Sequence, residues 1–332
     1  MKKLPSLILC GYERGGTTLL STILNSLNYY SGFEVGILCC ESPYKFKDFK
    51  PYFNMMKKGW MLSESILEDS ISSSFEHFYN TIISNSPFTK QPHKKNFFDK
   101  TPIYMSSLGQ VLNCTNFINK AIVIFRDPRA VFFSWAKRQK KENETFDDYI
   151  CKNIKVISNR YIKYFIGCIA HRKNLNVLFL SFEELCSKFD QQIINIKKFL
   201  NIEIDLNVKK INPIFKNNVE GDSINLEKIY EYKENLSKDT QNLILNETKL
   251  ASIFFFPLED KEKYSEYFQE KIFKIEKIFN IHGLPTNNFF YEIINNVYFE
   301  PETYLLRNPN VLNSKVNPNL HYKNFGIKEK RL

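Results

Sequence analysis

The first residues of the chain pass from an apolar run through a glycine-rich turn to a helical repeat of apolar positions. Residues 7–10 read Leu-Ile-Leu-Cys and end at Gly11. After the turn, apolar residues recur three or four positions apart, at Leu19, Leu20, Ile23, Leu24 and Leu27. A short apolar run before a glycine is typical of a buried strand, and the later spacing is typical of a helix. The pattern predicts a strand, a tight loop and a helix, in that order.

Three further apolar runs predict strands of the same sheet. They are residues 97–98, 121–125 and 177–180. Helices are expected after them, from residue 130, over 146–170, from a capping box at 181–184, and over 189–200. Strands that alternate with helices favour a parallel sheet covered on both faces. The expected fold class is therefore α/β, a three-layer P-loop-like fold with a small C-terminal appendage.

The last part of the chain has a different texture. Residues 226–279 are helical in pattern, and Gly283-Leu284-Pro285 is typical of a boundary. Aromatic residues and Asn-Pro turns dominate beyond it. We therefore predict one domain over residues 1–285 and a small C-terminal module over residues 290–332.

Composition narrows the classes of function. Lys and Arg exceed Asp and Glu by 46 to 36, which favours an anionic partner, but the lysines are scattered and indicate a solvated surface rather than a nucleic-acid groove. Seven cysteines without a paired framework indicate reduced thiols, and the five histidines show no metal-ligand spacing. No apolar stretch has the length of a membrane helix, and the N-terminal apolar run is too short for a secretion signal. We expect a cytoplasmic protein that uses no metal.

The glycine-rich turn predicts an anion-binding loop. Its glycines let an anion approach the main chain, and they are Gly11, Gly15 and Gly16. The first free N–H groups of the following helix point at such an anion, and they belong to Thr17, Thr18 and Leu19. Nucleotide-triphosphatase loops carry a lysine where Thr17 stands, whereas the cation here is Arg14. The alternative is an ordinary glycine-rich turn with a surface arginine.

Other charged residues are expected at the carboxyl edge of the sheet. Lys100 follows one predicted strand, and Arg126 ends another, with Ser134 about two turns into the next helix. Two carboxylates, Glu34 and Glu41, follow the first helix. These side chains could face a substrate. The alternatives are a salt-bridged Arg-Asp turn, a solvent-facing serine and glutamates that cap helices.

Three separated segments resemble the sulfotransferase family that uses 3′-phosphoadenosine-5′-phosphosulfate (PAPS). Residues 11–20 resemble its 5′-phosphosulfate loop, with Gly15 in place of a serine. Residues 126–135 resemble its 3′-phosphate motif, and Asp99-Lys100-Thr101-Pro102 is similar to the lysine-bearing turn between them. Phe182-Glu183-Glu184-Leu185 resembles a later Tyr-Glu-Asp-Leu element. The tail from residue 299 to 331 resembles a module of bacterial glycan-modifying proteins.

The resemblance implies a role for each candidate residue. Arg14 would hold the 5′-phosphosulfate, together with the loop residues Gly15, Gly16, Thr17, Thr18 and Leu19. Arg126 and Ser134 would bind the 3′-phosphate, with Lys216 as a further contact. Lys100 would contact the sulfuryl group. An acceptor hydroxyl needs a general base, and the resemblance places Glu34 in that role, with Glu41 as the second candidate.

The resemblance also bears on the acceptor. The branch that acts on small phenols and steroids carries a histidine where this chain has Pro102. We therefore expect a bacterial, carbohydrate-type enzyme that sulfates a hydroxyl of a glycan or a cell-surface precursor. Two alternatives stay open: a nucleotide kinase or triphosphatase on the same loop, and a non-enzymatic basic protein that binds polyanions.

Overall fold

The structure is a computed structural model of the 332-residue chain. It describes residues 4–89, 96–169, 171, 174–203, 219–220, 223–224, 229–249, 251, 273–275, 277–284, 292–294, 297–299, 301–329 and 331. Lys216 lies outside the described residues. The chain forms two compact units, Met1–Val131 with His171–Glu234 and Phe132–Ala170 with Asn235–Leu332.

The first unit is built on a five-stranded parallel sheet in the order β2-β3-β1-β4-β5. Its strands are β1 (Pro5–Gly11), β2 (Tyr29–Tyr30), β3 (Asn96–Lys100), β4 (Lys120–Phe125) and β5 (Val177–Ser181). Leu9 lies opposite Lys100, and Gly11 lies opposite Ile124. This register brings the ends of β1, β3 and β4 to one edge, where parallel α/β sheets bind their ligands.

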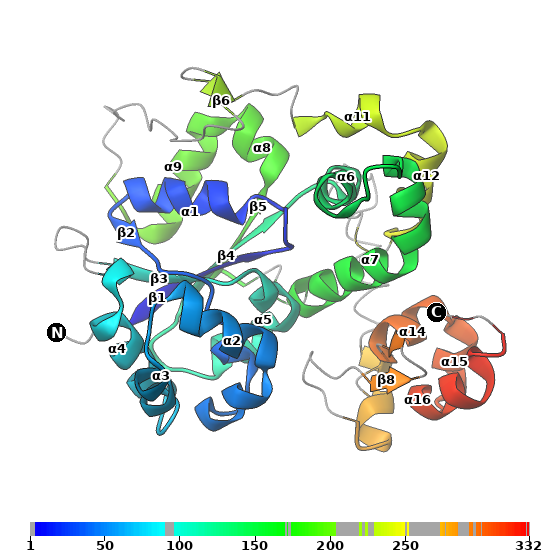
Figure 1. Ribbon diagram of the computed structural model, residues 1–332, viewed down its shortest axis with the longest axis horizontal. Helices are drawn as coiled ribbons and strands as arrows, with labels where there is room; N and C mark the ends of the chain where they lie inside the picture. The colour runs from blue at the N-terminus through cyan, green and yellow to red at the C-terminus, as the bar shows by residue number, and fades with distance from the viewer. Residues whose placement is uncertain are drawn as a thin grey trace. The chain divides into compact units, whose positions relative to one another are not determined.

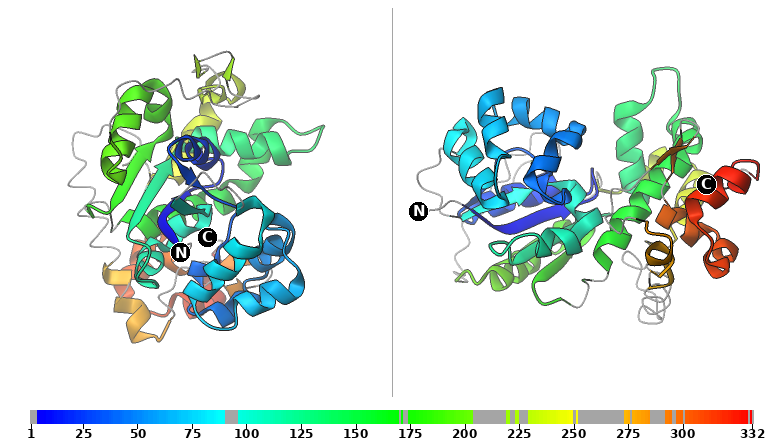
Figure 2. Two further views of the ribbon diagram at one scale, coloured as in Figure 1. Left: turned by 90° about the vertical axis from the view of Figure 1, so that its left-hand side faces the viewer. Right: turned by 90° about the horizontal axis from the view of Figure 1, so that it is seen from below.

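Helices cover both faces of this sheet. They are α1 (Thr17–Ser26), α2 (Lys50–Gly59), α3 (Glu64–Ser70), α4 (Phe75–Asn85), α5 (Leu108–Asn113), α8 (Phe182–Ser187) and α9 (Phe189–Leu200). Figures 1 and 2 show α1, α8 and α9 on one face and α2, α3 and α4 on the other. Under α1 and α9 the core joins Leu7 and Leu9 to Ile122 and Ile124. The predicted three-layer α/β fold is confirmed.

In its described residues, the second unit is helical with one small hairpin. Two helices cross the boundary between the units: most of α6 (Pro128–Gln139) and the last residue of α11 (Tyr232–Asn235) belong to the second unit. Its other elements are α7 (Phe146–Ile169), α12 (Lys238–Glu247), β8 (Glu292–Ile294), β9 (Val297–Phe299), α14 (Pro301–Arg307), α15 (Pro309–Ser314) and α16 (Pro318–His321). A two-stranded hairpin, β6 (Val219–Glu220) and β7 (Ser223–Ile224), belongs to the first unit. Ile162 of α7 shares one apolar cluster with Phe299, Tyr304 and Leu305.

Most predicted elements lie where the pattern placed them. The expected helix over 146–170 is α7, and Ser181 caps the start of α8 as predicted, with its Oγ accepting a hydrogen bond from the Glu184 N–H. The short edge strand β2 and the helix α2 have no counterpart in the prediction, because two residues and a lysine-rich segment show no clear period. The division at residues 285–290 stays a prediction; the compact units themselves divide the chain elsewhere.

Candidate functional site

The loop after β1 holds an arginine in an unfavourable backbone conformation. The Gly15 N–H donates to the Tyr12 carbonyl at 2.8 Å and closes a four-residue turn. Arg14, the third residue of that turn, has φ of 68°, a left-handed value that glycine or asparagine usually takes. The conformation costs a side-chain-bearing residue roughly 1–2 kcal/mol. Such local strain is concentrated at functional sites.

The end of the loop needs its glycine. Gly16 has φ of 104° and precedes α1, whose first turn contains the buried Thr17. A Cβ at this position would collide with the ring of Phe182. The backbone therefore passes directly over that ring and leaves the first N–H groups of α1 at the carboxyl edge of the sheet, where they can bind an anion.

Arg126 joins the end of β4 to this loop. Its Nη1 donates to the Arg14 carbonyl oxygen at 3.2 Å, and its guanidinium lies 4.4 Å from the centre of the Phe182 ring. Burial lowers the pKa of Arg126, Glu183 opposes that shift, and the nearby positive charge of Arg14 adds to it. Two cations of like sign thus lie within electrostatic range of each other beside a helix N-terminus. An anion would relieve their repulsion.

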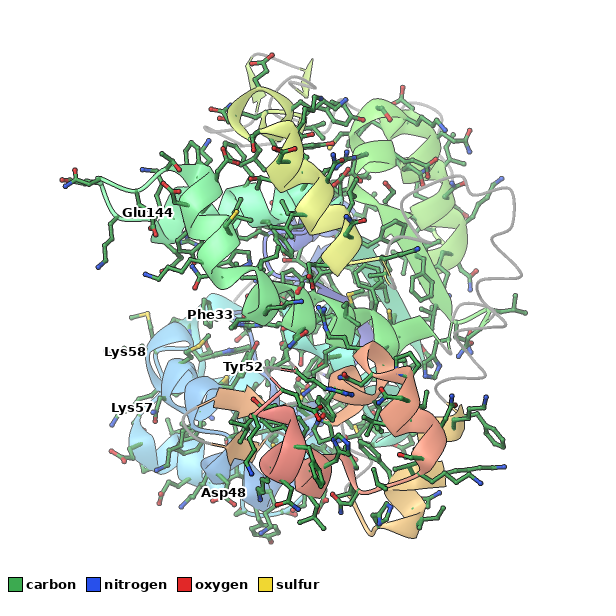
Figure 3. The ribbon with its side chains drawn as sticks, turned by 90° about the vertical axis from the view of Figure 1, so that its right-hand side faces the viewer. Phe33, Asp48, Tyr52, Lys57, Lys58 and Glu144 are labelled. Carbon is green, nitrogen blue, oxygen red and sulfur yellow. The ribbon has the colours of Figure 1, made fainter. Side chains whose placement is uncertain are left out.

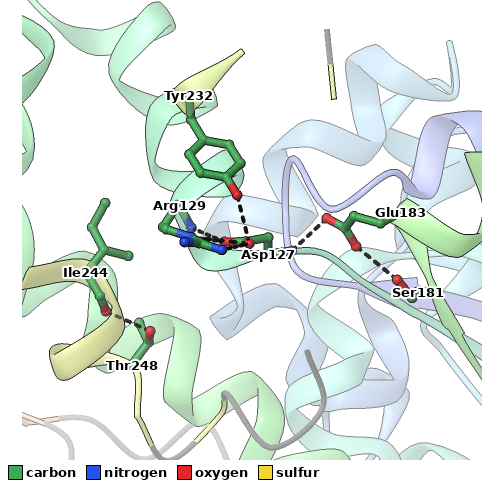
Figure 4. Close-up of polar contacts among 7 residues, drawn as sticks. All are labelled: Asp127, Arg129, Ser181, Glu183, Tyr232, Ile244 and Thr248. Atoms are coloured by element: carbon green, nitrogen blue, oxygen red, sulfur yellow. Dashed lines mark hydrogen bonds and ion pairs between the residues drawn. The ribbon is translucent and has the colours of Figure 1, made fainter. Parts of the chain in front are cut away.

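A carboxylate network holds the end of β4 in place. The Asp127 N–H donates to Glu183 Oε1 at 2.9 Å, and the Ser181 hydroxyl donates to Glu183 Oε2 at 2.9 Å (Figure 4). Arg129 donates from Nη2 to Asp127 Oδ2 at 2.6 Å, and the Tyr232 hydroxyl donates to the same oxygen at 3.2 Å. The Arg-Asp salt bridge, the alternative interpretation of this turn, is made by Arg129, and the Arg126 guanidinium is directed to the loop.

One of the two candidate glutamates forms an ion pair with the candidate lysine. Lys100 Nζ lies 3.0 Å from Glu34 Oε1, and both side chains are about four-fifths buried or more, with 16% and 21% exposure. Their positions are 66 residues apart in the chain. Glu41, the second candidate, is exposed. A carboxylate and an ammonium thus meet at the end of β3, one strand away from the arginine loop.

A buried aspartate organises the backbone around this ion pair. Asp99 accepts hydrogen bonds from Tyr79 at 2.5 Å, Thr101 at 2.7 Å and Tyr104 at 3.0 Å. The Thr101 hydroxyl also accepts a hydrogen bond from the Val35 N–H at 2.9 Å. Burial raises the pKa of Asp99 to about 6, although the three hydroxyl donors oppose that shift. The relay connects the residue before Lys100 to the residue after Glu34.

The other predicted site residues are placed by their elements. Thr17, Thr18 and Leu19 form the first turn of α1, and Ser134 lies in α6 within the second unit. Sequence reasoning missed the relay through Asp99 and the ring of Phe182 under Arg126. The apolar, turn-like context of Asp99 and the aromatic position beside Glu183 carry weak signals for both. The part of the chain that the structure describes contains no cluster of three or more potential metal ligands.

Comparison with protein families agrees with this geometry. The model of the family described as "Sulfotransferase domain" matches residues 4–276, more than three-quarters of the chain. The chain belongs to the sulfotransferase family. Its members transfer sulfuryl groups, and the matched region of this sulfotransferase contains the loop, Glu34, Lys100 and Arg126.

Solved structures similar to this sulfotransferase include other members of the family. The sulfotransferase domain of the olefin synthase from Synechococcus PCC 7002 is 16% identical, with a TM-score of 0.48, and the match covers 77% of this chain and 96% of that one. A mouse sulfotransferase complexed with adenosine 3′,5′-bisphosphate (PAP) is 14% identical, with a TM-score of 0.43, 79% of this chain and 89% of that one being covered. The search of curated proteins found no match. Among the described residues, none of the helices is both long and apolar enough to span a bilayer.

Proposed function

We propose that this sulfotransferase transfers a sulfuryl group from PAPS to a hydroxyl of a glycan or cell-surface precursor in the cytoplasm. The observation that carries the donor assignment is the hydrogen bond from the Arg126 guanidinium to the Arg14 carbonyl oxygen. It couples the predicted 3′-phosphate residue to the predicted 5′-phosphosulfate loop. The relative in complex with PAP supports the same donor.

The residues present fit a phosphosulfate group. The N–H groups at the start of α1 supply neutral donors, and Arg14 supplies a fixed positive charge on a strained turn. Arg126, with Ser134 and Lys216, is proposed for the 3′-phosphate. We expect binding and transfer without a metal ion, because a sulfuryl group carries less negative charge than a phosphoryl group.

Bound PAPS supplies the sulfuryl group: the acceptor oxygen bonds to sulfur, and the bond from sulfur to the bridging phosphate oxygen breaks, so that PAP leaves with the bonding electrons. Glu34 accepts the proton of the attacking hydroxyl as general base, with Glu41 as the second candidate. Lys100 and Arg14 stabilise the negative charge that develops on the transferred and leaving oxygens. The ion pair of Glu34 with Lys100 supports this assignment, since it holds a proton acceptor and a cation side by side.

The donor assignment is tested by calorimetric titration of the full chain with PAP. We expect magnesium-independent binding that weakens roughly 10- to 100-fold in Arg126→Met, because hydrogen bonds between charged groups are lost while the apolar stem still covers Phe182. Arg138→Met removes the same charge from an exposed position and should bind PAP like the unchanged protein. Equal binding by both variants would contradict the proposal.

The two rival functions predict other results. A kinase or triphosphatase would prefer ATP with magnesium, but its loop needs a lysine where this chain has Thr17. A polyanion-binding protein would bind heparin-like polymers with an affinity that falls steeply with salt and does not change in Arg126→Met. Measuring ATP with magnesium and a sulfated polymer in the same titration series separates all three functions.

A further inference from the structure

An open pocket is lined by the residue that precedes the proposed base in the chain. Its volume is about 470 Å³, which is within the range of small-molecule sites, and its lining residues are Phe33, Asn54, Met55, Lys58 and Gly59. Phe33 immediately precedes Glu34, and consecutive Cα atoms are about 3.8 Å apart. The pocket and the proposed base therefore share one short stretch of the chain.

One wall of the pocket is an exposed aromatic ring with a defined support. The Phe33 side chain is 40% exposed, a high value for a large apolar residue. Its ring lies directly on the backbone of Gly59, where any Cβ would collide with it. Met55 of α2 adds a second apolar group. This wall suits the CH face of a sugar ring, which packs on aromatic surfaces while its hydroxyls stay in contact with water.

The same pocket also has a positively charged lining residue, a lysine at the end of α2. Residues 45–58 contain five lysines and a single acidic residue. Lys57 is paired with Glu64 at 2.7 Å, and Lys47 with Glu68 at 2.8 Å. Lys58 lines the pocket and has no carboxylate partner within the described part of the chain. Figure 3 labels Phe33 and Lys58, which both line the pocket, and Lys57, which does not. The local excess of positive charge attracts anions.

We infer that this pocket binds the acceptor and selects an acidic sugar, one that carries a carboxylate or a phosphate. The sugar ring packs against Phe33 and Met55, its anionic group pairs with Lys58, and one of its hydroxyls is presented to Glu34. The inference rests on the proposed sulfotransferase function and names the acceptor class for that same site. Its elements are an aromatic platform, one available cation and a base, all within a single compact unit.

The test is the binding of two matched probes to the full chain saturated with PAP. The probes are p-nitrophenyl β-D-glucuronide and p-nitrophenyl β-D-glucoside, which differ by one carboxylate, and their dissociation constants are measured by calorimetry. We expect the glucuronide to bind more tightly by about three- to fivefold, the size of a partly exposed charge pair. In Lys58→Gln the preference should disappear, whereas the neighbouring Lys57→Gln, which loses a lysine outside the pocket, should keep it.

The outcomes distinguish a failure of the proposed acceptor pocket from a failure of the proposed function. PAP binding together with a charge preference that Lys58→Gln abolishes supports the acidic-sugar pocket. PAP binding with equal affinities for the two probes, with no binding of the glucuronide, or with equal effects of the two lysine variants overturns the pocket and leaves the donor assignment intact. Failure to bind PAP would instead overturn the proposed function itself.

Discussion

At the scale of single residues, burial disfavours the charged form of Asp99, and its hydrogen-bond donors offset this effect only in part. The carboxyl group is fully buried, and its three hydroxyl donors do not compensate for the loss of water. Charging Asp99 in the folded protein is therefore unfavourable relative to the unfolded chain. The three hydroxyls can still serve it in either protonation state, because each one can rotate its hydrogen.

This leads to a pH-dependent stability that Asp99→Asn should remove. The pKa of Asp99 rises from 3.8 to about 6 on folding, so between these values the folded chain binds more protons than the unfolded chain. Its contribution to the unfolding free energy is then lost as pH increases through that window, by on the order of 3 kcal/mol. Urea unfolding at pH 4, 5, 6 and 7 measures it as the difference between the two proteins. A difference that stays constant over this range would show that Asp99 does not titrate there.

At the scale of elements, the end of β3 and the segment after β2 act as one structure. The Thr101 N–H donates to the Leu9 carbonyl oxygen at 3.0 Å, and the Thr101 hydroxyl receives the Val35 N–H. Lys100 and Glu34, next to these two residues, are thereby held at 3.0 Å. The relay fixes the backbone, and the ion pair follows from it.

Thr101→Val tests whether the relay positions Glu34 without contributing to PAP binding. The substitution keeps the shape of the side chain but leaves the buried Val35 N–H without its acceptor, which costs roughly 1–3 kcal/mol and frees the Glu34 backbone. We expect faster hydrogen exchange at Val35 and a turnover number at least tenfold lower, with PAP affinity unchanged.

The matched control is Thr248→Val. Thr248 is also fully buried, but it follows the last residue of α12, and its hydroxyl donates to the Ile244 carbonyl oxygen of that helix at 2.7 Å (Figure 4). This variant should keep the turnover number and the exchange rate at Val35. If both variants lowered turnover equally, the effect would come from general destabilisation and the relay would have no special part.

Local elements and the loop could be predicted from the sequence, whereas long-range pairs could not. The β1–loop–α1 unit is encoded within residues 5–26, so apolar spacing and the glycines suffice. Glu34 and Lys100 meet only because β2 and β3 are neighbours in the sheet, and β2 has two residues. The choice of Glu34 over Glu41 came from family resemblance, and the ion pair with Lys100 adds a physical reason for it. The further hydrogen bond to Asp127 comes from Tyr232, about a hundred residues away, and no local pattern predicts it.

At the scale of the whole molecule, the C-terminal residues are part of a larger core. Ile162 of α7 packs in the same cluster as Phe299 and Tyr304. Arg307 at the end of α14 donates to Glu247 Oε2 at 2.5 Å and to the Ser158 hydroxyl at 2.9 Å. These contacts join the residues predicted as a separate module to α7 and α12 of the second unit.

The contact between Arg307 and Glu247 of α12 includes further charged groups. Lys155 adds a second cation, 2.7 Å from Glu247 Oε1. Burial raises the pKa of Glu247, but the hydrogen bonds from Lys155 and Arg307 outweigh burial and leave it lowered overall. The folded second unit therefore stabilises the carboxylate form, and this stability is lost as pH falls through the lowered pKa. Arg307 supplies one of the two cations that stabilise this carboxylate, and it also donates to the Glu247 backbone carbonyl oxygen at 3.3 Å.

If residues 290–332 formed an independent module, removing the contact between Arg307 and Glu247 would leave the stability of the rest of the second unit unchanged. We expect instead that Arg307→Met lowers its stability by about 2 kcal/mol, because hydrogen bonds between charged groups are lost from a largely buried site. Trp135 lies in the second unit and Trp60 in the first, so a Trp60→Phe background reports the unfolding of the second unit by fluorescence. Arg331→Met, which removes a more exposed ion pair with Glu329, should change the unfolding free energy by less than about 0.5 kcal/mol. Equal unfolding free energies for the two arginine variants would mean that the tail folds apart from α7 and α12, as the sequence pattern suggests.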